Sequence, residues 1–378
     1  MTTTADVVVI GAGVIGASIA HHLAVSGARV IVLERGAIAA SGATVSSAGQ
    51  IRLYHPDPAD AELAAHSLPT FRRWADVVGG TCGFRPTGFV FLGRPGSAAP
   101  TAAVVAALSR RGIDIRVLPV DRCRELYPGL HLGDEDVVAY EPAGGYADPG
   151  LTIRSLLTAA QRHGAVVWAD DPAHALVRRG SAVAGVRSAT GEIHAGQVVV
   201  ANGTGAAPLL AGAAVPHALV ARTVGWCLVD TAAAPREPGA LPVTIDDGAG
   251  TYFRPDGSGR LLVRAVLDGA TVAPGVDTVP REVVAASLGR AVRRVPALRD
   301  APLVTTRVER EAYTPDERPM IGPVAQAPGL YVATGFSGGG FKAAPAVGEF
   351  VAAELLRGEI RDELSRYRPG RLLSAARL

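Results

Sequence analysis

The first 34 residues hold the feature that most constrains the fold. An apolar segment over 6–10 leads into a glycine-rich turn over 11–16, and a second apolar segment over 29–33 ends at Glu34. A strand, a glycine turn, a helix over 14–25 and a second strand predict one βαβ unit. Such a unit binds a dinucleotide at the turn.

Each glycine and the acidic residue of this unit have a physical role. Gly11 makes the tight turn, and Gly13 lets backbone N–H groups approach a pyrophosphate at the positive N-terminus of the helix. Gly16 lets the helix pack closely on the strand. Glu34 ends the second strand, where its carboxylate accepts hydrogen bonds from ribose hydroxyls.

A second glycine-rich segment near the C-terminus favours FAD over NAD as the dinucleotide. Leu330 to Gly335 predicts a strand, Phe336 to Lys342 a glycine loop, and 345–356 an alanine-rich helix. The N-terminus of a second helix can face the flavin ring or its ribityl chain, as the first faces the pyrophosphate.

Composition excludes several other classes of protein. A chain of 378 residues exceeds one ordinary core, so two domains are expected. A net charge of +2 without a basic block gives no footprint for nucleic acid. Glycines interrupt the apolar segment Val7 to Ala20, and His21 and His22 follow it, so no membrane span is expected. Without a signal peptide, and with three scattered cysteines read as buried reduced thiols, we expect a cytoplasmic protein. No metal site is expected, and the oligomeric state is left open.

Five motifs together resemble the amine and amino-acid oxidoreductase family that includes sarcosine oxidase, glycine oxidase and D-amino-acid oxidase. They occur in the family's order and are the following: Gly11 to Gly16 with Glu34, Ser41 to Gly49, Val198 to Gly203, Tyr313 to Gly322, and Gly335 to Lys342. Between them, over about 81–147 and 216–310, the resemblance is loose.

The resemblance implies an α/β fold with a discontinuous Rossmann-like FAD-binding domain and a substrate domain. The first would comprise 1–80, 148–215 and 311–378, and the second, a mainly antiparallel sheet with helices, 81–147 and 216–310. Local patterns predict helices over 59–78 and 151–163, and strands over 84–92, 165–168 and 260–263.

The resemblance also implies which residues bind FAD. Ala173 would contact adenine through its backbone. The full expected set is Gly11, Gly13, Val14, Ile15, Gly16, Glu34, Arg35, Ser41, Thr44, Ser46, Ser47, Ala48, Gly49, Gln50, Ala173, Ala201, Asn202, Gly203, Gly335, Phe336, Ser337, Gly338, Gly339, Gly340, Phe341 and Lys342.

Lys342 is the one lysine among 37 basic residues, the others being arginines. A compact ammonium differs in chemistry from a planar guanidinium, so its position at the end of the glycine segment indicates a function. By resemblance, Lys342 and Arg52 bind the substrate carboxylate, and Tyr252 belongs to the substrate pocket. Tyr54 and His55 are candidates for the same pocket, His55 with a structural role preferred.

Departures from the family pattern refine these expectations. Sarcosine oxidase attaches its flavin to a cysteine just before the Tyr-Thr pair, where this chain has Glu311-Ala312. Relatives that use a histidine carry it where this chain has Val45-Ser46-Ser47, so we expect non-covalent FAD. Glu311 also replaces a carboxylate-binding arginine of glycine oxidase. The lysine that promotes oxygen reduction in sarcosine oxidase aligns with Leu262, and Arg264 lies two residues further.

The sequence therefore predicts an enzyme that oxidises the C–N bond of a small primary or N-alkylated amino acid by hydride transfer to FAD. The imine would hydrolyse, and O2 would be reduced to H2O2. A dehydrogenase with another electron acceptor, a flavin monooxygenase or halogenase, and a non-catalytic or NAD-sensing protein remain alternatives.

Overall fold

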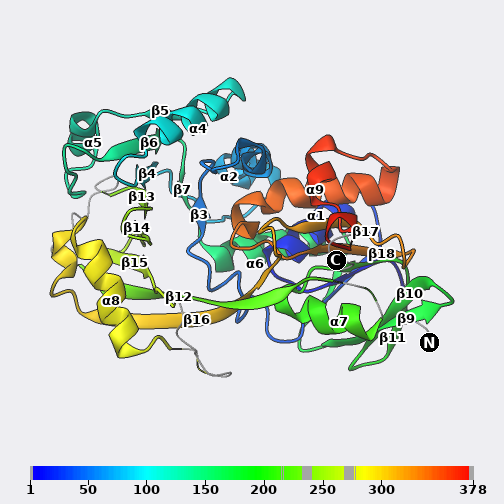
Figure 1. Cartoon of the computed structure of the whole chain (residues 1–378). Coiled ribbons are helices and arrows are strands. Elements are labelled where there is room, and N and C mark those ends of the chain that lie inside the picture. The colour runs from blue at the N-terminus through cyan, green and yellow to red at the C-terminus, as the bar shows by residue number, and fades with distance from the viewer. Residues whose placement is uncertain are drawn as a thin grey trace.

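The computed structural model describes residues 3–213, 215, 217–231, 241–267, 276 and 278–373. Two eight-stranded sheets organise this part of the chain (Figure 1), and a small third sheet pairs β3 (Gln50–Ile51) with β7 (Gly145–Tyr146). This is the predicted α/β class with a second, mainly antiparallel sheet. The proposed domain boundaries themselves stay a prediction.

The first sheet has the strand order β17-β18-β11-β1-β2-β8, in which β18 to β8 are parallel and the edge strand β17 is antiparallel to β18. Strands β9 and β10 are attached as an antiparallel extension of β11. Its strands are β1 (Thr3–Ile10), β2 (Val30–Leu33), β8 (Val166–Trp168), β9 (Ala173–Arg179), β10 (Ala182–Ser188), β11 (Glu192–Val200), β17 (Met320–Pro323) and β18 (Leu330–Thr334).

The strand register determines where the nucleotide motifs meet. Ile10 pairs with Leu33 on one side and with Val200 on the other, and Val200 pairs with Val332 of β18. Because these strands are parallel, their carboxyl ends lie at one edge of the sheet. The three glycine-containing motifs and Glu34 therefore come together although more than 300 residues separate the first motif from the last.

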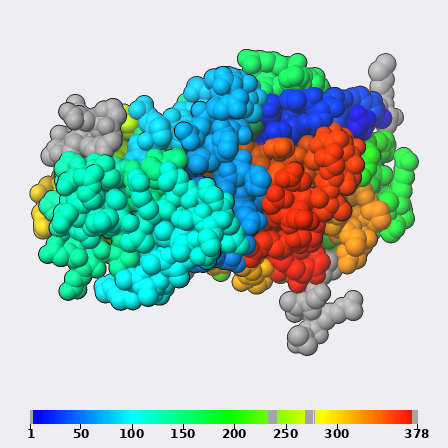
Figure 2. Space-filling view, turned by 90° about the horizontal axis from the view of Figure 1, so that it is seen from above, coloured from blue at the N-terminus to red at the C-terminus, as the bar shows by residue number. Residues whose placement is uncertain are grey.

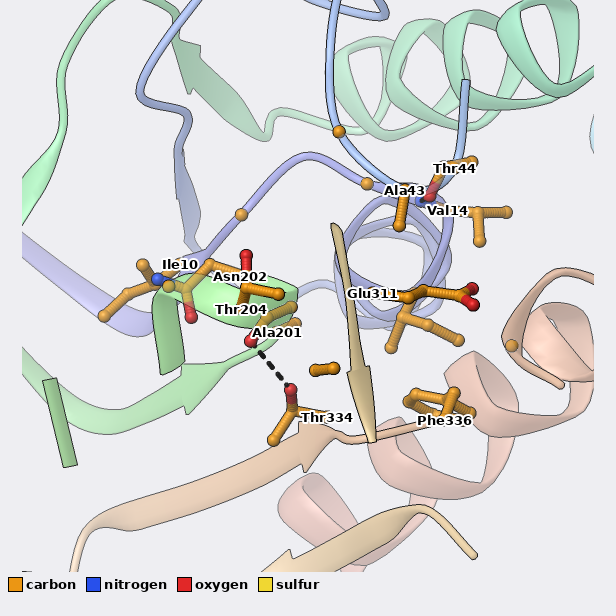
Figure 3. A pocket seen from close by; sticks show the side chains of 18 of the residues that line it. Ile10, Val14, Ala43, Thr44, Ala201, Asn202, Thr204, Glu311, Thr334 and Phe336 are labelled. Atoms are coloured by element: carbon orange, nitrogen blue, oxygen red, sulfur yellow. Dashed lines mark hydrogen bonds between the residues drawn. The ribbon is translucent and has the colours of Figure 1, made fainter. Parts of the chain in front are cut away.

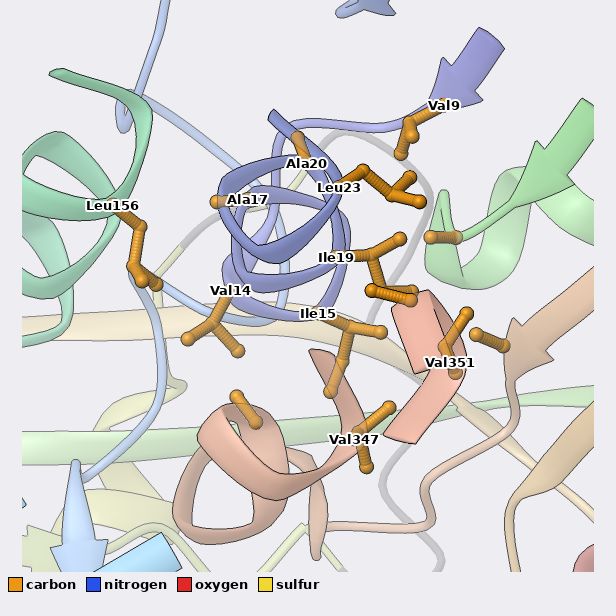
Figure 4. Packing of buried hydrophobic residues seen from close by; sticks show 14 of the residues in the cluster. Val9, Val14, Ile15, Ala17, Ile19, Ala20, Leu23, Leu156, Val347 and Val351 are labelled. Atoms are coloured by element: carbon orange, nitrogen blue, oxygen red, sulfur yellow. The ribbon is translucent and has the colours of Figure 1, made fainter. Parts of the chain in front are cut away.

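Helix α1 (Val14–Val25) confirms the predicted helix over 14–25 and lies in the main core. Figure 4 shows its apolar side chains between Leu156 of α6 (Pro149–Arg162) and Val347 and Val351 of α9 (Gly340–Arg357). Ten of its twelve residues are buried, which explains its nearly uniform apolar composition. Its N-terminus is thereby fixed against the edge where β1 ends.

The second sheet has the order β16-β12-β15-β14-β13-β4-β6-β5 and is antiparallel except for the β13–β4 pair. Its strands are β4 (Phe89–Gly93), β5 (Arg116–Val117), β6 (Val137–Glu141), β12 (Val220–Asp230), β13 (Val243–Asp246), β14 (Thr251–Pro255), β15 (Arg260–Arg264) and β16 (Leu303–Tyr313). The long strands β12 and β16 extend from this sheet towards the first one (Figure 1).

The remaining elements are short helices. They are η1 (Pro58–Ala61), α2 (Glu62–Arg72), α3 (Trp74–Val77), α4 (Ala98–Arg110), α5 (Val120–Leu126), η2 (Gly203–Gly205), α7 (Ala206–Gly212), α8 (Arg281–Val292), η3 (Pro296–Leu298), η4 (Asp362–Tyr367) and α10 (Gly370–Leu373). In the view from above, the segment that contains α2 lies between α9 and the part of the chain around 90–140 (Figure 2). The Ser67 hydroxyl of α2 accepts the backbone N–H of Ala346 at 3.0 Å.

Three local predictions were wrong in their bounds. The expected helix over 59–78 is divided into η1, α2 and α3, with Arg73 in a non-helical conformation four residues after the internal Pro69. The expected strand over 84–92 begins only at Phe89. Helix α9 begins at Gly340 instead of 345, so Lys342 lies in its first turn. Glycine disfavours a helix interior but is tolerated at the first position, and Pro345, which lies inside the helix, lacks a backbone N–H donor.

Cys82, Cys123 and Cys227 are free and buried, as expected. Burial raises the pKa of each thiol to about 11, so these cysteines are inert packing residues. No helix in the described part of the chain is long and apolar enough to cross a membrane.

Candidate active site

A cavity of about 400 Å³ lies at the edge where β1, β2, β11 and β18 end (Figure 3). Nineteen of the residues expected to bind FAD line it. They are Gly11, Gly13, Val14, Ile15, Glu34, Arg35, Ser41, Thr44, Ser47, Ala173, Ala201, Asn202, Gly203, Gly335, Phe336, Ser337, Gly338, Gly340 and Phe341. The N-terminal residues of both α1 and α9 are in this set, so two positive helix ends face one cavity.

The glycines of the first turn are required by close backbone contacts. A Cβ atom on Gly11, which has φ +101°, would lie 2.7 Å from Asn202 Cα, and one on Gly16 would lie 1.9 Å from the Gly11 carbonyl oxygen. The Ala12 N–H donates to the Glu34 carboxylate at 2.8 Å, and the Val14 N–H donates to the Thr44 hydroxyl at 3.2 Å. The turn is thus held in place by side chains that also line the cavity.

The polar groups along the cavity walls fit a dinucleotide. Asn202 Oδ1 and Ser46 Oγ are buried without a hydrogen-bond partner among the described residues, and both residues line a cavity wall. Buried polar atoms are normally paired, so these atoms indicate a polar ligand. The glycine turns leave backbone N–H groups accessible to phosphates, as FAD requires.

Seven expected cofactor residues lie outside this cavity. Ser46, Ala48, Gln50 and Lys342 line a second, adjoining cavity, whereas Gly16, Gly49 and Gly339 line neither. Gly49 has a structural role, because it has φ +62° and its Cβ would lie 2.2 Å from the Ala147 carbonyl oxygen. Sequence reasoning missed wall residues such as Ala43, Thr204, Glu309, Arg310 and Thr334. These residues lie within the sequence motifs or close to them in the chain, and this proximity could have identified them.

The second cavity, of about 260 Å³, brings together the three predicted catalytic residues Arg52, Tyr252 and Lys342. Arg52 follows β3, Tyr252 lies on β14 and Lys342 lies in the first turn of α9. Residues Ala43, Ser47, Glu311, Gly338 and Phe341 line both cavities, so a ligand in one is next to a ligand in the other.

Two cations and a buried carboxylate form one charge cluster. Burial, followed by the positive charge of Arg52, lowers the pKa of Lys342 to about 7. Burial also lowers the pKa of Arg52, although a guanidinium remains charged. The nearby Glu141 carboxylate is 1 % exposed and accepts the backbone N–H groups of Leu53, at 2.8 Å, and Tyr54. Sequence reasoning missed Glu141, which lies where the resemblance is loose.

Glu311 of β16 contributes a carboxylate to the walls of both cavities. Burial raises the pKa of Glu311 to about 7, and Lys342 and the Tyr313 hydroxyl favour its anionic form. Burial raises the pKa of Tyr252 and of Tyr313 to about 12, so both phenols are protonated donors near neutral pH.

Side chains of the second sheet hold the segment over 46–50, which lies next to the cavities. The Trp226 indole donates to the Ser46 carbonyl at 2.8 Å, and the Arg254 guanidinium donates to the Ala48 carbonyl. Arg254 also lies over the ring of Tyr146, with 4.3 Å from Cζ to the ring centroid. These contacts fix Ser47 and Gln50, which line the cavity walls.

Tyr54, His55 and Leu262 line neither cavity. Tyr54 is buried and stacks on Phe91 at 4.2 Å between ring centroids. His55 accepts the Asp57 N–H at 3.2 Å, and burial lowers its pKa. Leu262 is buried, and Arg264 on the same strand lines the second cavity. The pocket role of Tyr54 and His55 stays a prediction, and the hydrogen bond between Asp57 and His55 fits the structural role preferred for His55.

Comparison with known proteins agrees with this geometry. The model of the family described as FAD dependent oxidoreductase matches residues 6–354. The chain belongs to this family, and its cofactor is FAD.

Two relatives and one solved structure illustrate the similarity. Monomeric sarcosine oxidase of Streptomyces avermitilis is 30% identical over 99% of this chain and 100% of its own length. Mitochondrial dimethylglycine dehydrogenase of Mus musculus is 26% identical over 97% of this chain, which spans only 44% of that protein. The structure of L-proline dehydrogenase from P. horikoshii superposes with a TM-score of 0.91 at 24% identity, covering 99% of each chain, which shows the shared fold.

Proposed function

We propose that this enzyme oxidises the C–N bond of a small amino acid, primary or N-alkylated, with FAD as hydride acceptor and O2 as final electron acceptor. One observation carries the proposal: Arg52 and Lys342 line the same small cavity, which adjoins the nucleotide cavity. Two cations there match the carboxylate of an amino acid. The full-length similarity to a sarcosine oxidase supports the same class of substrate.

The residues of the second cavity orient the substrate. Arg52 and Lys342 hold its carboxylate by charge-assisted hydrogen bonds, which fixes the Cα–H bond relative to the adjoining cavity. Tyr252, as a protonated phenol, donates a further hydrogen bond from the β14 wall. FAD, when bound, supplies the two-electron acceptor for the hydride. The imine product then hydrolyses to ammonia or an amine and a carbonyl compound.

Attachment of FAD is proposed to be non-covalent. The described residues that line the two cavities include no cysteine, and their one histidine, His174, follows Ala173 at the expected adenine end. After acid precipitation, we expect a colourless pellet and a yellow supernatant. A pellet that stays yellow would show a covalent bond.

A screen for anaerobic flavin bleaching tests the activity. Purified holoenzyme is mixed without oxygen with glycine, sarcosine, proline, N,N-dimethylglycine and larger amino acids, and loss of the flavin absorption band is recorded. We expect bleaching by at least one small amino acid and none by the corresponding amine that lacks the carboxylate. Bleaching by NADPH alone would favour a monooxygenase, and failure of every amine and amino acid would refute the proposal.

A further inference from the structure

Glu311 occupies the junction of the two cavities and has no role in holding the substrate carboxylate. It lies on β16, directly opposite Arg222 of β12, and its side chain lines both cavities. In Figure 3 the side chain projects into the space between Ala43 and Phe336. A negative charge here is repelled by a carboxylate, so it calls for a different partner on the ligand.

The turn before α9 places Glu311 and Lys342 on the two sides of a pair of glycines. A Cβ on Gly338 would lie 3.8 Å from Glu311 Oε2, and a Cβ on Gly339 would lie 3.6 Å from Lys342 Nζ. The carboxylate and the ammonium therefore border one small space. A ligand with one anionic and one cationic end, such as an amino acid, complements this arrangement.

Glu311 differs from Glu141, the other carboxylate near the cations. Glu141 is fully enclosed and accepts two backbone N–H groups, which fixes it as an anchor of the chain at Leu53 and Tyr54. The Glu311 carboxylate instead faces titratable side chains at the cavity surface. It is therefore available to exchange a proton with a ligand.

We propose that Glu311 binds the ammonium group of the substrate and accepts its proton before hydride transfer. This inference rests on the proposed function and assigns a catalytic residue within it. In the step, one N–H bond breaks, the proton moves to a carboxylate oxygen of Glu311, and the bonding electron pair remains on nitrogen. That pair forms the C=N bond when the hydride leaves Cα.

The charged groups around Glu311 are compatible with this role. A pKa near 7 lets Glu311 be anionic at neutral pH and still basic enough to take a proton. Lys342, the one lysine, is engaged by the substrate carboxylate, and the two phenols of the wall hold their protons. The charged or titratable groups near Glu311 include Arg52, Glu141, Arg222, Tyr252, Arg264, Glu309, Arg310, Tyr313 and Lys342.

A matched pair of ligands tests binding without turnover. The ligands 2-aminoisobutyrate and isobutyrate differ only in the amino group. Neither can be oxidised to an imine, because 2-aminoisobutyrate has no hydrogen on Cα and isobutyrate has no amine. Their Kd values are measured on holoenzyme from the change in flavin absorbance between pH 6 and 9. Glu311→Gln keeps the shape of the side chain, and Glu317→Gln, an exposed partner of Arg222, is the control.

We expect wild type and Glu317→Gln to prefer 2-aminoisobutyrate, and this preference to grow as Glu311 ionises near pH 7. Glu311→Gln should reduce the preference about tenfold or more and remove its pH dependence, with isobutyrate bound as well or better. The rate of anaerobic flavin reduction by the best amino acid should rise through about pH 7 in wild type and only at higher pH in the variant.

Unchanged ligand preference and an unchanged pH profile in Glu311→Gln would overturn the proposal. If Glu311→Gln loses FAD, Glu311→Asp, which keeps a carboxylate, is tested instead. A pH-dependent preference for 2-aminoisobutyrate in Glu311→Asp supports the proposed role, and the absence of this preference refutes it. If no amino acid reduces wild-type flavin, the proposed function fails, an outcome that is distinct from failure of the Glu311 assignment.

Discussion

Lys342 carries its charge where burial and a neighbouring guanidinium both disfavour it. Its pKa is lowered to about 7 for these reasons, while Glu311 in the same cavity has its pKa raised to about 7 by burial. Two groups of opposite charge type thus titrate in the same range. Such shifted groups are typical of sites where charge is used on a ligand and not for stability.

Binding of a simple carboxylate should consequently weaken as pH rises through about 7. Below this pH Lys342 is protonated and Glu311 is neutral, so both states favour an anion. Above it Lys342 loses its charge and Glu311 gains one, so both changes oppose the anion. Titration of holoenzyme with isobutyrate, followed by flavin absorbance, measures this dependence.

Variants of the two cations separate their contributions. Losing one charge-assisted contact costs about 1.5–3 kcal/mol, or roughly ten- to a hundred-fold in Kd. We expect Lys342→Met and Arg52→Met each to show this loss at pH 6, and only Lys342→Met to flatten the pH dependence. Arg110→Met, an exposed residue at the end of α4, is the control. Equal loss toward amines without a carboxylate would instead assign the residues to FAD placement or folding.

At the level of elements, the site depends on how closely α1 and α9 approach each other. A Cβ on Gly348 of α9 would lie 2.2 Å from Ser18 Oγ and 2.6 Å from the Ser18 carbonyl carbon and oxygen. Backbone atoms of a packed helix cannot move away cheaply. Because both helices begin at the nucleotide cavity, this contact sets the distance between their N-termini.

Gly348→Ala should therefore destabilise the protein, although alanine is the better helix former. We expect a loss of about 1–3 kcal/mol in the free energy of unfolding, together with weaker retention of FAD. Gly289→Ala, in the exposed part of α8 with no atom within 4 Å of the new Cβ, should be neutral or stabilising by up to about 1 kcal/mol. Denaturant unfolding of the two variants compares them; stabilisation in both would show that the helices can separate freely.

Sequence reasoning reached the elements whose signals are local and missed those set by tertiary contacts. The apolar segment and glycine turn predicted α1 to the residue, because one short segment carries all of that information. The start of α9 at Gly340 was missed, since packing of Phe341 and Ala344 in the core stabilises a turn that glycine alone disfavours. Glu141 was missed because its function comes from contacts with a segment almost ninety residues away.

In the whole molecule, the second cavity exists only where the two sheets meet. Its walls come from the loop after α1 and β2, from β12, β14 and β15 of the second sheet, and from the start of α9. Contacts of Trp226 and Arg254 with the Ser46 and Ala48 carbonyls join these parts. If O2 is the electron acceptor, as we propose, it reaches the same space, and the charges of the second sheet then affect reoxidation of the flavin.

Arg264 is the residue of β15 that lines the second cavity. Leu262, which the resemblance matched with the oxygen-activating lysine of sarcosine oxidase, lies opposite Arg254 and Leu228 in the sheet and lines neither cavity. Arg264 lies at the cavity wall, where its guanidinium donates to the Gly250 carbonyl at 3.1 Å. A fixed cation at the cavity wall would stabilise the negative charge that develops as oxygen accepts its first electron.

Arg264→Met should therefore slow reoxidation of photoreduced holoenzyme by roughly ten- to a thousand-fold, the effect of one preorganised donor. Stopped-flow mixing with aerated buffer, without substrate, measures this rate. Arg260→Met, at the exposed end of the same strand, is the control, and Leu262→Lys should give no acceleration because that position is buried away from the cavity. Rapid reoxidation in Arg264→Met would remove the electrostatic argument, and acceleration by Leu262→Lys would return the oxygen site to the position of the lysine in sarcosine oxidase. A wild-type enzyme that reacts slowly with oxygen in the same experiment would favour a dehydrogenase with another electron acceptor.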